Sequence, residues 1–272
     1  MDQFINVRKL IKSKNPTLLK WLPRFVIRYI EKIIHQDDVN AFMIKMKGAS
    51  AYEFCNAAME EFQIDLELSG KENIIQPPES CIFVGNHPLG GFDALALVAS
   101  INDKRPDLHF IVNDFLLSVE NLKKRFIGVN KVGKNARESL KKVDDQFASD
   151  TATFIFPAGL VSRKQDGVIK DLEWSKTFIT KSKKYKKPVI PVYIEGRLTN
   201  RFYRLANIRK ALGIKLNIEM FFLVDELFKQ KNSKMNIVIG KPVEPSVFDK
   251  SKNDKQWAQW LKEKVYLLKE QL

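Results

Sequence analysis

A histidine and an aspartate stand close together in the segment Gly85-Asn86-His87-Pro88-Leu89-Gly90-Gly91-Phe92-Asp93. A carboxylate that accepts the proton of one imidazole nitrogen fixes the tautomer and orientation of the ring, and it leaves the other nitrogen free to act as a base. Such a pair can deprotonate a hydroxyl for attack on an activated acyl carbonyl. His87 and Asp93 are therefore a candidate catalytic pair. The competing interpretation is that Asp93 only caps a helix and His87 is an ordinary loop histidine.

The elements on either side of this pair are suited to display it. Residues 81–84 form a short apolar run that predicts a strand, and His87 follows that run in a turn that contains Pro88 and two glycines. Residues 94–101 predict a helix that Asp93 opens. Because ligands of an open parallel sheet collect beyond the carboxyl ends of its strands, we expect His87 at a ligand-binding edge.

Further apolar runs alternate with helical patterns along the rest of the chain. Strands are expected at residues 108–112, 153–156, 189–194 and 235–239, and helices at residues 114–124 and 257–272. This alternation predicts an α/β fold with a mostly parallel central sheet flanked by helices. The lysine-rich stretch between residues 170 and 187 is interleaved with Trp174, Phe178 and Ile179, so we expect a helix with a solvated basic face there.

The N-terminal part of the chain has a different pattern. Residues 18–34 place apolar and aromatic side chains at helical spacing, with basic residues every four positions on another face. Two interpretations stay open, a helix in a membrane interface and an ordinary helix packed on the domain. A second amphipathic stretch at residues 50–65 precedes a turn-rich passage. We expect an N-terminal helical region over residues 1–65, membrane-associating in the first interpretation, and a main domain over residues 66–272.

The composition narrows the classes of partner. The 272 residues carry a formal net charge of +14, which favours nucleic acid, anionic lipid headgroups or phosphorylated cofactors. We find no phosphate-binding loop, dinucleotide fingerprint, serine-hydrolase elbow or nucleic-acid motif. The three histidines do not cluster with cysteines or carboxylates, so we expect no metal. The sequence has no run of ~20 apolar residues, so we expect a cytosolic protein or one attached to a membrane from the cytosolic side.

Four sequence blocks in order resemble the glycerolipid (lysophospholipid) acyltransferase family. The first is Asn-His followed by Asp, at residues 86–93. The second is Ile-Gly-Val-Asn-Lys at residues 127–131 with Ala-Arg-Glu-Ser at 136–139, the third is Phe-Pro-Ala-Gly at 156–159, and the fourth is residues 189–194. The resemblance covers about residues 66–245 and implies acyl transfer to a lipid hydroxyl. It makes His87 and Asp93 the catalytic pair, without a covalent acyl-enzyme.

Three departures from the family pattern bear on the acceptor. Five residues separate His87 and Asp93 where the family has four, and the paired glycines can absorb the extra residue. Lys131 stands in the region of an Arg that helps to hold glycerol phosphate, and Ala158 replaces a Glu. The sequence is similar to a hemolysin-like branch that contains O-acyltransferases of glycine and ornithine lipids. That branch implies the 3-hydroxyl of an N-acyl amino-acid lipid as acceptor, with lysophosphatidate or glycerol phosphate as the alternative. A basic, non-catalytic nucleic-acid-binding protein is the alternative of another class.

The resemblance also implies the remaining partners and site residues. The donor is an acyl carrier protein or coenzyme A thioester that acts as co-substrate, with no tightly bound cofactor. The partners are a lipid acceptor and, peripherally, an anionic membrane at the cytoplasmic face of the inner membrane, with no nucleic acid. The residues expected to bind substrate are Asn86, Gly90, Gly91, Lys131, Arg137, Pro157, Ala158, Gly159, Ser162 and Arg163.

Some of these residues have a physical rationale of their own. Arg163 can hold a carboxylate with two parallel hydrogen bonds. The N–H of Gly159 could meet the oxyanion of a tetrahedral intermediate, although a tight turn after a strand explains the same glycine. Lys131 and Arg137 could meet an anionic acceptor or an acidic carrier protein, or could serve only the solubility of the surface.

Overall fold

The chain folds into two compact units. The computed structural model describes residues 4–14, 21–129, 136–214 and 217–272. The smaller unit combines Met1–Ala49 with Thr199–Lys231, and the larger unit combines Ser50–Leu198 with Asn232–Leu272. The boundary between residues 65 and 66 stays a prediction.

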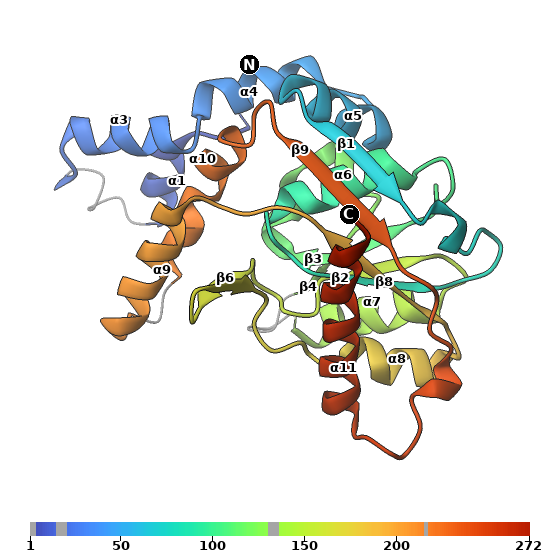
Figure 1. Cartoon of the computed structure of the whole chain (residues 1–272). Helices are drawn as coiled ribbons and strands as arrows, with labels where there is room; N and C mark the ends of the chain where they lie inside the picture. The colour runs from blue at the N-terminus through green and yellow to red at the C-terminus, as the bar shows by residue number, and fades with distance from the viewer. Residues whose placement is uncertain (1–3, 15–20, 130–135, 215–216) are drawn as a thin grey trace. The chain divides into compact units, whose positions relative to one another are not determined.

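The larger unit is built on a seven-stranded sheet in the order β1-β9-β8-β2-β5-β3-β4. Every neighbouring pair runs parallel except β8 and β9, which confirms the mostly parallel sheet (Figure 1). Since β2, β3, β4, β5 and β8 share one direction, their carboxyl ends meet at one edge. The strands are β1 (Asp65–Ser69), β2 (Ile82–Gly85), β3 (His109–Asn113), β4 (Phe126–Val129), β5 (Thr153–Ile155), β8 (Val189–Ile194) and β9 (Lys234–Ile239).

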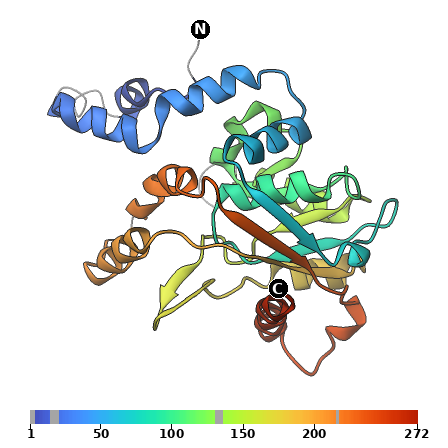
Figure 2. The ribbon, with the colours of Figure 1, turned by 45° about the horizontal axis from the view of Figure 1, so that its top comes forward.

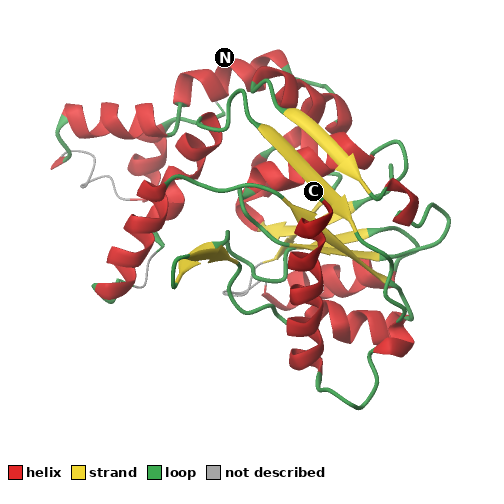
Figure 3. Cartoon of the chain, viewed as in Figure 1, coloured by secondary structure: helices red, strands yellow, loops and turns green. Residues whose placement is uncertain are grey.

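Helices cover both faces of this sheet. On one face lie α5 (Ala51–Glu61) and α6 (Gly91–Ile101), and on the other lie α7 (Ala136–Ala148), α8 (Thr177–Tyr185) and α11 (Asp254–Leu267), as Figures 2 and 3 show. Such two-sided cover explains why β2 and β8 are buried along their whole length. Within the lysine-rich stretch of residues 170–187, the predicted helix is confirmed as α8, whose Phe178 and Ile179 are buried, while Trp174 precedes the helix.

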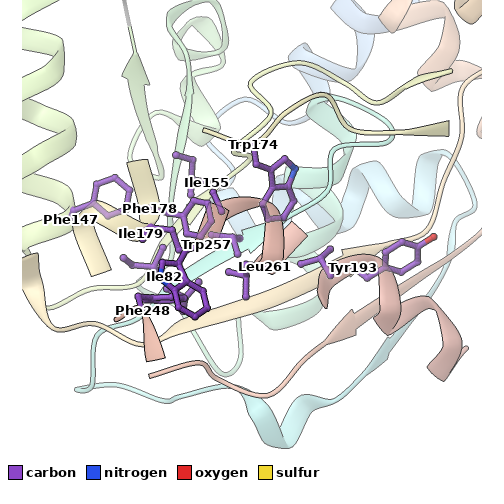
Figure 4. Packing of buried hydrophobic residues seen from close by; sticks show 14 of the residues in the cluster. Ile82, Phe147, Ile155, Trp174, Phe178, Ile179, Tyr193, Phe248, Trp257 and Leu261 are labelled. Atoms are coloured by element: carbon purple, nitrogen blue, oxygen red, sulfur yellow. The ribbon is translucent and has the colours of Figure 1, made fainter. Parts of the chain in front are cut away.

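The face covered by α7, α8 and α11 holds an aromatic core (Figure 4). Trp174 meets Phe178 edge to face at 6.0 Å between ring centroids, and Phe248 meets Trp257 at 5.7 Å. Burial of each large apolar side chain contributes about 1.5–3 kcal/mol. On the opposite face the ring of Phe154 stacks on Phe110, with centroids 5.3 Å apart.

The smaller unit is helical over its described residues. Asn40 of α4 joins that helix to the start of the described chain, because its side chain exchanges two hydrogen bonds with the backbone of Ile5, both 2.8 Å long. Arg201 donates to the Tyr29 hydroxyl over 3.1 Å and so ties the two chain segments together. Its elements are α1 (Val7–Lys14), α3 (Arg24–Ile33), α4 (Gln36–Lys45), α9 (Asn200–Ala211), the 3₁₀ helix η4 (Ile218–Phe222) and α10 (Leu223–Phe228).

Some elements differ from the sequence prediction. The helix predicted over residues 114–124 is wrong, because the chain forms two short 3₁₀ helices, η2 (Asp114–Ser118) and η3 (Glu120–Leu122), before it enters β4. The edge strands β1 and β4 were not predicted. Strand β1 alternates exposed and half-buried positions, and β4 is only four residues long. The hairpin of β6 (Arg163–Gln165) and β7 (Val168–Lys170) was also not predicted.

Candidate active site

Asn86 brings the chain to the carboxyl edge of the sheet. Its amide Nδ2 donates to the carbonyl of Ile194 over 2.8 Å, and its Oδ1 accepts from the N–H of Ile194 over 2.7 Å. This buried side chain therefore continues the pairing of β2 with β8 beyond the last residue of β2. The next residue, His87, stands at the edge where ligands of parallel sheets bind, as predicted.

His87 and Asp93 are hydrogen-bonded. The Nδ1 atom of His87 lies 2.8 Å from Oδ2 of Asp93. The Asp93 side chain is fully buried, whereas the His87 side chain keeps 17% of its surface exposed. A carboxylate in this position selects the imidazole tautomer with the proton on Nδ1. In the part of the chain that the structure describes, no hydrogen bond to Nε2 of His87 is found.

The carboxylate of Asp93 also holds the loop that carries His87. Its Oδ2 accepts from the N–H groups of Leu89 and Gly90, each over 3.1 Å. Gly90 has φ of +78°, which a residue with a side chain adopts only under strain. Burial raises the pKa of the Asp93 carboxyl, while the bonds from His87 and Leu89 act in the opposite direction. Asp93 thus caps α6 and contacts the His87 ring at the same time, and its catalytic role stays a prediction.

An aromatic ring fixes the imidazole from one side. The ring of Phe156 stacks on His87 with centroids 4.0 Å apart and an interplanar angle of 23°. Phe156 follows β5, the direct neighbour of β2 in the sheet. The first and third sequence blocks are therefore in contact.

The backbone of His87 is held by two groups that lie far away in the sequence. Its N–H donates to Oδ1 of Asp171 over 3.2 Å, and its carbonyl accepts from the N–H of Ser162 over 2.8 Å. Asp171 is buried and also accepts from Ser162 Oγ over 2.6 Å and from Trp174 Nε1 over 2.8 Å. Sequence reasoning missed Asp171, since no motif or local periodicity links it to a residue 84 positions away.

The third block forms a tight turn after β5. The N–H of Gly159 donates to the carbonyl of Phe156 over 3.0 Å, and the carbonyl of Pro157 accepts from Ser175. Gly159 is exposed with φ of +67°, and Ala158 packs against the aromatic core. Because the N–H of Gly159 is engaged in this turn, the structure favours the turn over the predicted oxyanion contact.

The other predicted substrate-binding residues have different surroundings. Arg163 is buried, and its Nη1 donates to the carbonyl of Val161 over 2.8 Å. Gly91 is exposed, and a Cβ there would meet no atom within 4 Å. Arg137 is exposed in the first turn of α7. Lys131 lies outside the described residues. Their contacts with substrate stay predictions.

The described residues contain no group of His, Cys, Asp and Glu side chains that could hold a metal ion. The site offers an imidazole whose Nδ1 is hydrogen-bonded to Asp93, and whose Nε2 has no hydrogen bond among the described residues. This arrangement can accept a proton from a hydroxyl at Nε2 and return it to a leaving group.

Several known proteins resemble this chain over nearly its whole length. A family model described as acyltransferase matches residues 9–272. Two relatives named lyso-glycine lipid O-acyltransferase, from Phocaeicola vulgatus and Bacteroides thetaiotaomicron, are each 43% identical over 267 residues. The alignments cover 97% of this chain and 95% and 97% of the relatives, respectively.

A solved structure shares the fold. The 1-acyl-sn-glycerophosphate (LPA) acyltransferase PlsC from Thermotoga maritima superposes with a TM-score of 0.53 at 18% identity, over 97% of this chain and 93% of that chain. The family model and the two relatives extend over nearly the whole sequence. The chain therefore belongs to the acyltransferase family, and it is an acyltransferase.

Proposed function

We propose that this acyltransferase moves a fatty acyl chain from a thioester donor to the 3-hydroxyl of an N-acyl amino-acid lipid, with a lyso-glycine lipid as the acceptor. The names of the two relatives at 43% identity support this acceptor. The observation that carries the chemistry is the 2.8 Å contact between His87 Nδ1 and Asp93 Oδ2, which leaves Nε2 of His87 for the acceptor hydroxyl.

The reaction runs by direct attack. Nε2 of His87 takes the proton of the acceptor hydroxyl while that oxygen forms a bond to the thioester carbonyl carbon. The tetrahedral intermediate collapses, the C–S bond breaks, and the departing sulfur takes the proton back from Nε2. Asp93 stays ionised and stabilises the imidazolium through Nδ1. No acyl-enzyme forms.

The donor is an acyl carrier protein or coenzyme A thioester, used as a co-substrate without a tightly bound cofactor. We expect Lys131 and Arg137 to bind the anionic donor or acceptor through their positive charge. Arg137 is exposed on α7. Arg163 is the candidate partner of the acceptor carboxylate, because an arginine binds a carboxylate with two parallel bonds.

A purified assay tests the proposal. Acyl carrier protein and coenzyme A thioesters are offered with lyso-glycine lipid, lyso-ornithine lipid, lysophosphatidate and glycerol 3-phosphate in separate reactions. We expect ester formation on the amino-acid lipids, abolished in a folded His87→Ala variant. Faster acylation of lysophosphatidate would move the acceptor to glycerolipids, and substantial activity in His87→Ala would overturn the role of the base.

We also propose that the enzyme binds peripherally to an anionic membrane, at the cytoplasmic face of the inner membrane. Trp21 is 82% exposed and Phe25 is 73% exposed, and the exposed basic residues Arg24 and Arg28 lie within seven positions of them in the sequence. Exposed aromatic rings among cationic side chains favour a membrane interface. No helix in the described ranges is long and apolar enough to cross a membrane.

A further inference from the structure

The connection between β7 and α8 carries a buried carboxylate that contacts the base-bearing loop. Asp171 is 1% exposed. Its backbone is fixed by α11, because its N–H donates to the Tyr266 hydroxyl over 2.7 Å and its carbonyl accepts from Lys262 Nζ over 2.7 Å. The carboxylate of Asp171 is thus presented from a rigid support.

Among the described residues, three groups meet this carboxylate, and each is a hydrogen-bond donor. Oδ1 accepts from the Ser162 hydroxyl at 2.6 Å and from the His87 N–H at 3.2 Å, and Oδ2 accepts from Trp174 Nε1 at 2.8 Å. A group that accepts on both oxygens is required here, since a buried donor without an acceptor costs about 1–3 kcal/mol.

The contacts converge on the main chain of one residue, His87. Asp171 takes the N–H of His87, and Ser162, which donates its hydroxyl to Asp171, gives its own N–H to the carbonyl of His87. His87 is therefore held from both sides of its main chain, independently of the bond from its ring to Asp93.

We propose that Asp171 is a positioning residue for His87, and that Ser162 acts with it rather than as a substrate ligand. Ser162 is 2% exposed and its hydroxyl is donated inward, so it offers little surface to an acceptor lipid. The pair fixes where the backbone of His87 lies, and Asp93 and Phe156 fix how its ring turns. The inference rests on His87 being the base of the proposed reaction.

Asp171→Asn tests the role. An amide has one acceptor oxygen, so either His87 or Trp174 loses its acceptor. We expect the new amide to turn its Nδ2 toward Ser162 and His87. This orientation loses the 3.2 Å bond from the His87 N–H and keeps the 2.8 Å bond from Trp174, and the Ser162 hydroxyl can turn to accept from Nδ2. We expect kcat to fall about 10- to 100-fold, because small misplacement of a reacting group has effects of this size. KM for donor and acceptor should stay within about twofold, since Asp171 is 1% exposed and offers almost no surface to a substrate.

Trp174→Phe provides the matched control and the rescue. Alone it removes the other donor from Asp171 and should lower stability with little change in kcat. Combined with Asp171→Asn it frees the amide to turn its oxygen back toward His87, so the double variant should recover kcat relative to Asp171→Asn. The ¹⁵N-histidine spectrum gives a direct readout, because the hydrogen-bonded Nδ1 proton of His87 should shift or broaden in Asp171→Asn only.

Ser162→Ala keeps the test decisive if Asp171→Asn does not fold. A positioning role predicts a lower kcat at constant KM, whereas a substrate contact predicts a higher KM. The positioning role is wrong if Asp171→Asn retains wild-type kcat and an unchanged Nδ1 signal, or if Ser162→Ala changes KM alone. His87→Ala distinguishes a failure of the proposed base from a failure of the positioning role. Activity in His87→Ala overturns the proposed base. An inactive His87→Ala together with a fully active Asp171→Asn overturns only the positioning role.

Discussion

The imidazole ring of His87 lies nearly parallel to the phenyl ring of Phe156, with 4.0 Å between their centroids. Phe156 in turn contacts Phe154 of β5 at 4.7 Å. The ring of the proposed base is thus stacked on Phe156, which in turn contacts a ring buried in the core of the sheet. A rotation of the imidazole away from Asp93 would break this stacking.

Phe156→Leu should lower kcat about tenfold, because an aliphatic side chain fills the space but does not hold the imidazole plane. KM for either substrate should change little. Phe156→Tyr keeps the ring and serves as the control, for which we expect nearly wild-type kcat. Steady-state kinetics with saturating donor decides the matter, and equal kcat values for Leu and Tyr variants would contradict the orienting role of the ring.

Asp93→Asn should lower kcat by about 10²- to 10⁴-fold, because the neutral amide does not stabilise the imidazolium that forms during the reaction. An amide of the same shape can still accept from Leu89 and Gly90, so the loop should keep its conformation. A single-turnover assay measures the chemical step directly. A loss of less than about fivefold would mean that Asp93 acts only as the helix cap.

Asp93→Asn should lower kcat, but it should not lower the thermal stability of the protein at neutral pH. Burial raises the pKa of Asp93, so stability from its protonated form is present at low pH and is lost as pH rises through the folded-state pKa. At neutral pH the ionised, buried carboxylate of Asp93 therefore lowers the stability of the wild type, and this loss is absent in Asp93→Asn. We expect Asp93→Asn to melt at or above the wild-type temperature at pH 7, with the difference narrowing toward pH 4. A variant that melts well below the wild type at pH 7 contradicts this expectation.

Gly196→Ala should destabilise the loop that carries His87. Gly196 follows β8, and a Cβ at this position would lie 2.8 Å from Cγ of the buried Leu89. Overpacking of this kind costs about 1–3 kcal/mol. In urea unfolding, Leu89→Ala combined with Gly196→Ala should cost less than the sum of the single variants, because the clash has lost one partner. Strict additivity would show that the two residues do not press on each other.

Trp21→Ser with Phe25→Ser should weaken binding to anionic vesicles by roughly 10- to 100-fold, the effect of withholding two large apolar side chains from a membrane interface. Leu140→Ser with Leu267→Ser, at exposed positions of α7 and α11, provides the control. Co-sedimentation at low and high salt is the measurement, and added salt should reduce binding. Equal losses in both double variants would place the contact elsewhere.

The sequence predicted the interior of the sheet better than its edges. The range of β8 was predicted at Val189–Ile194, because a strand buried on both faces is a continuous apolar run. The strand β1 alternates exposed and half-buried positions over five residues, so its pattern does not separate it from a loop. The strand β4 ends at Gly128-Val129, and its short apolar run was not recognised because it directly follows residues with a helical pattern.

The candidate site was predictable only as far as local spacing reaches. His87 and Asp93 lie within one loop, so their contact follows from chain geometry. Phe156 was within a recognised block, but its stacking on His87 needs the pairing of β2 with β5. Asp171 carries no local signal, because its role depends on the way the β7–α8 connection folds back beneath the loop.

The position of β1 has a consequence for synthesis on the ribosome. The sheet register pairs Asp65 with Lys234, and within the described ranges β9 is the one strand that pairs with β1. At about 5–20 residues per second, β1 leaves the ribosome roughly 10–30 seconds before its partner does. During that interval its edge is open to wrong pairing, which strands resist by carrying charges. The acidic residues Asp65 and Glu67 in this short strand are therefore suited to a nascent chain that must wait for its neighbour.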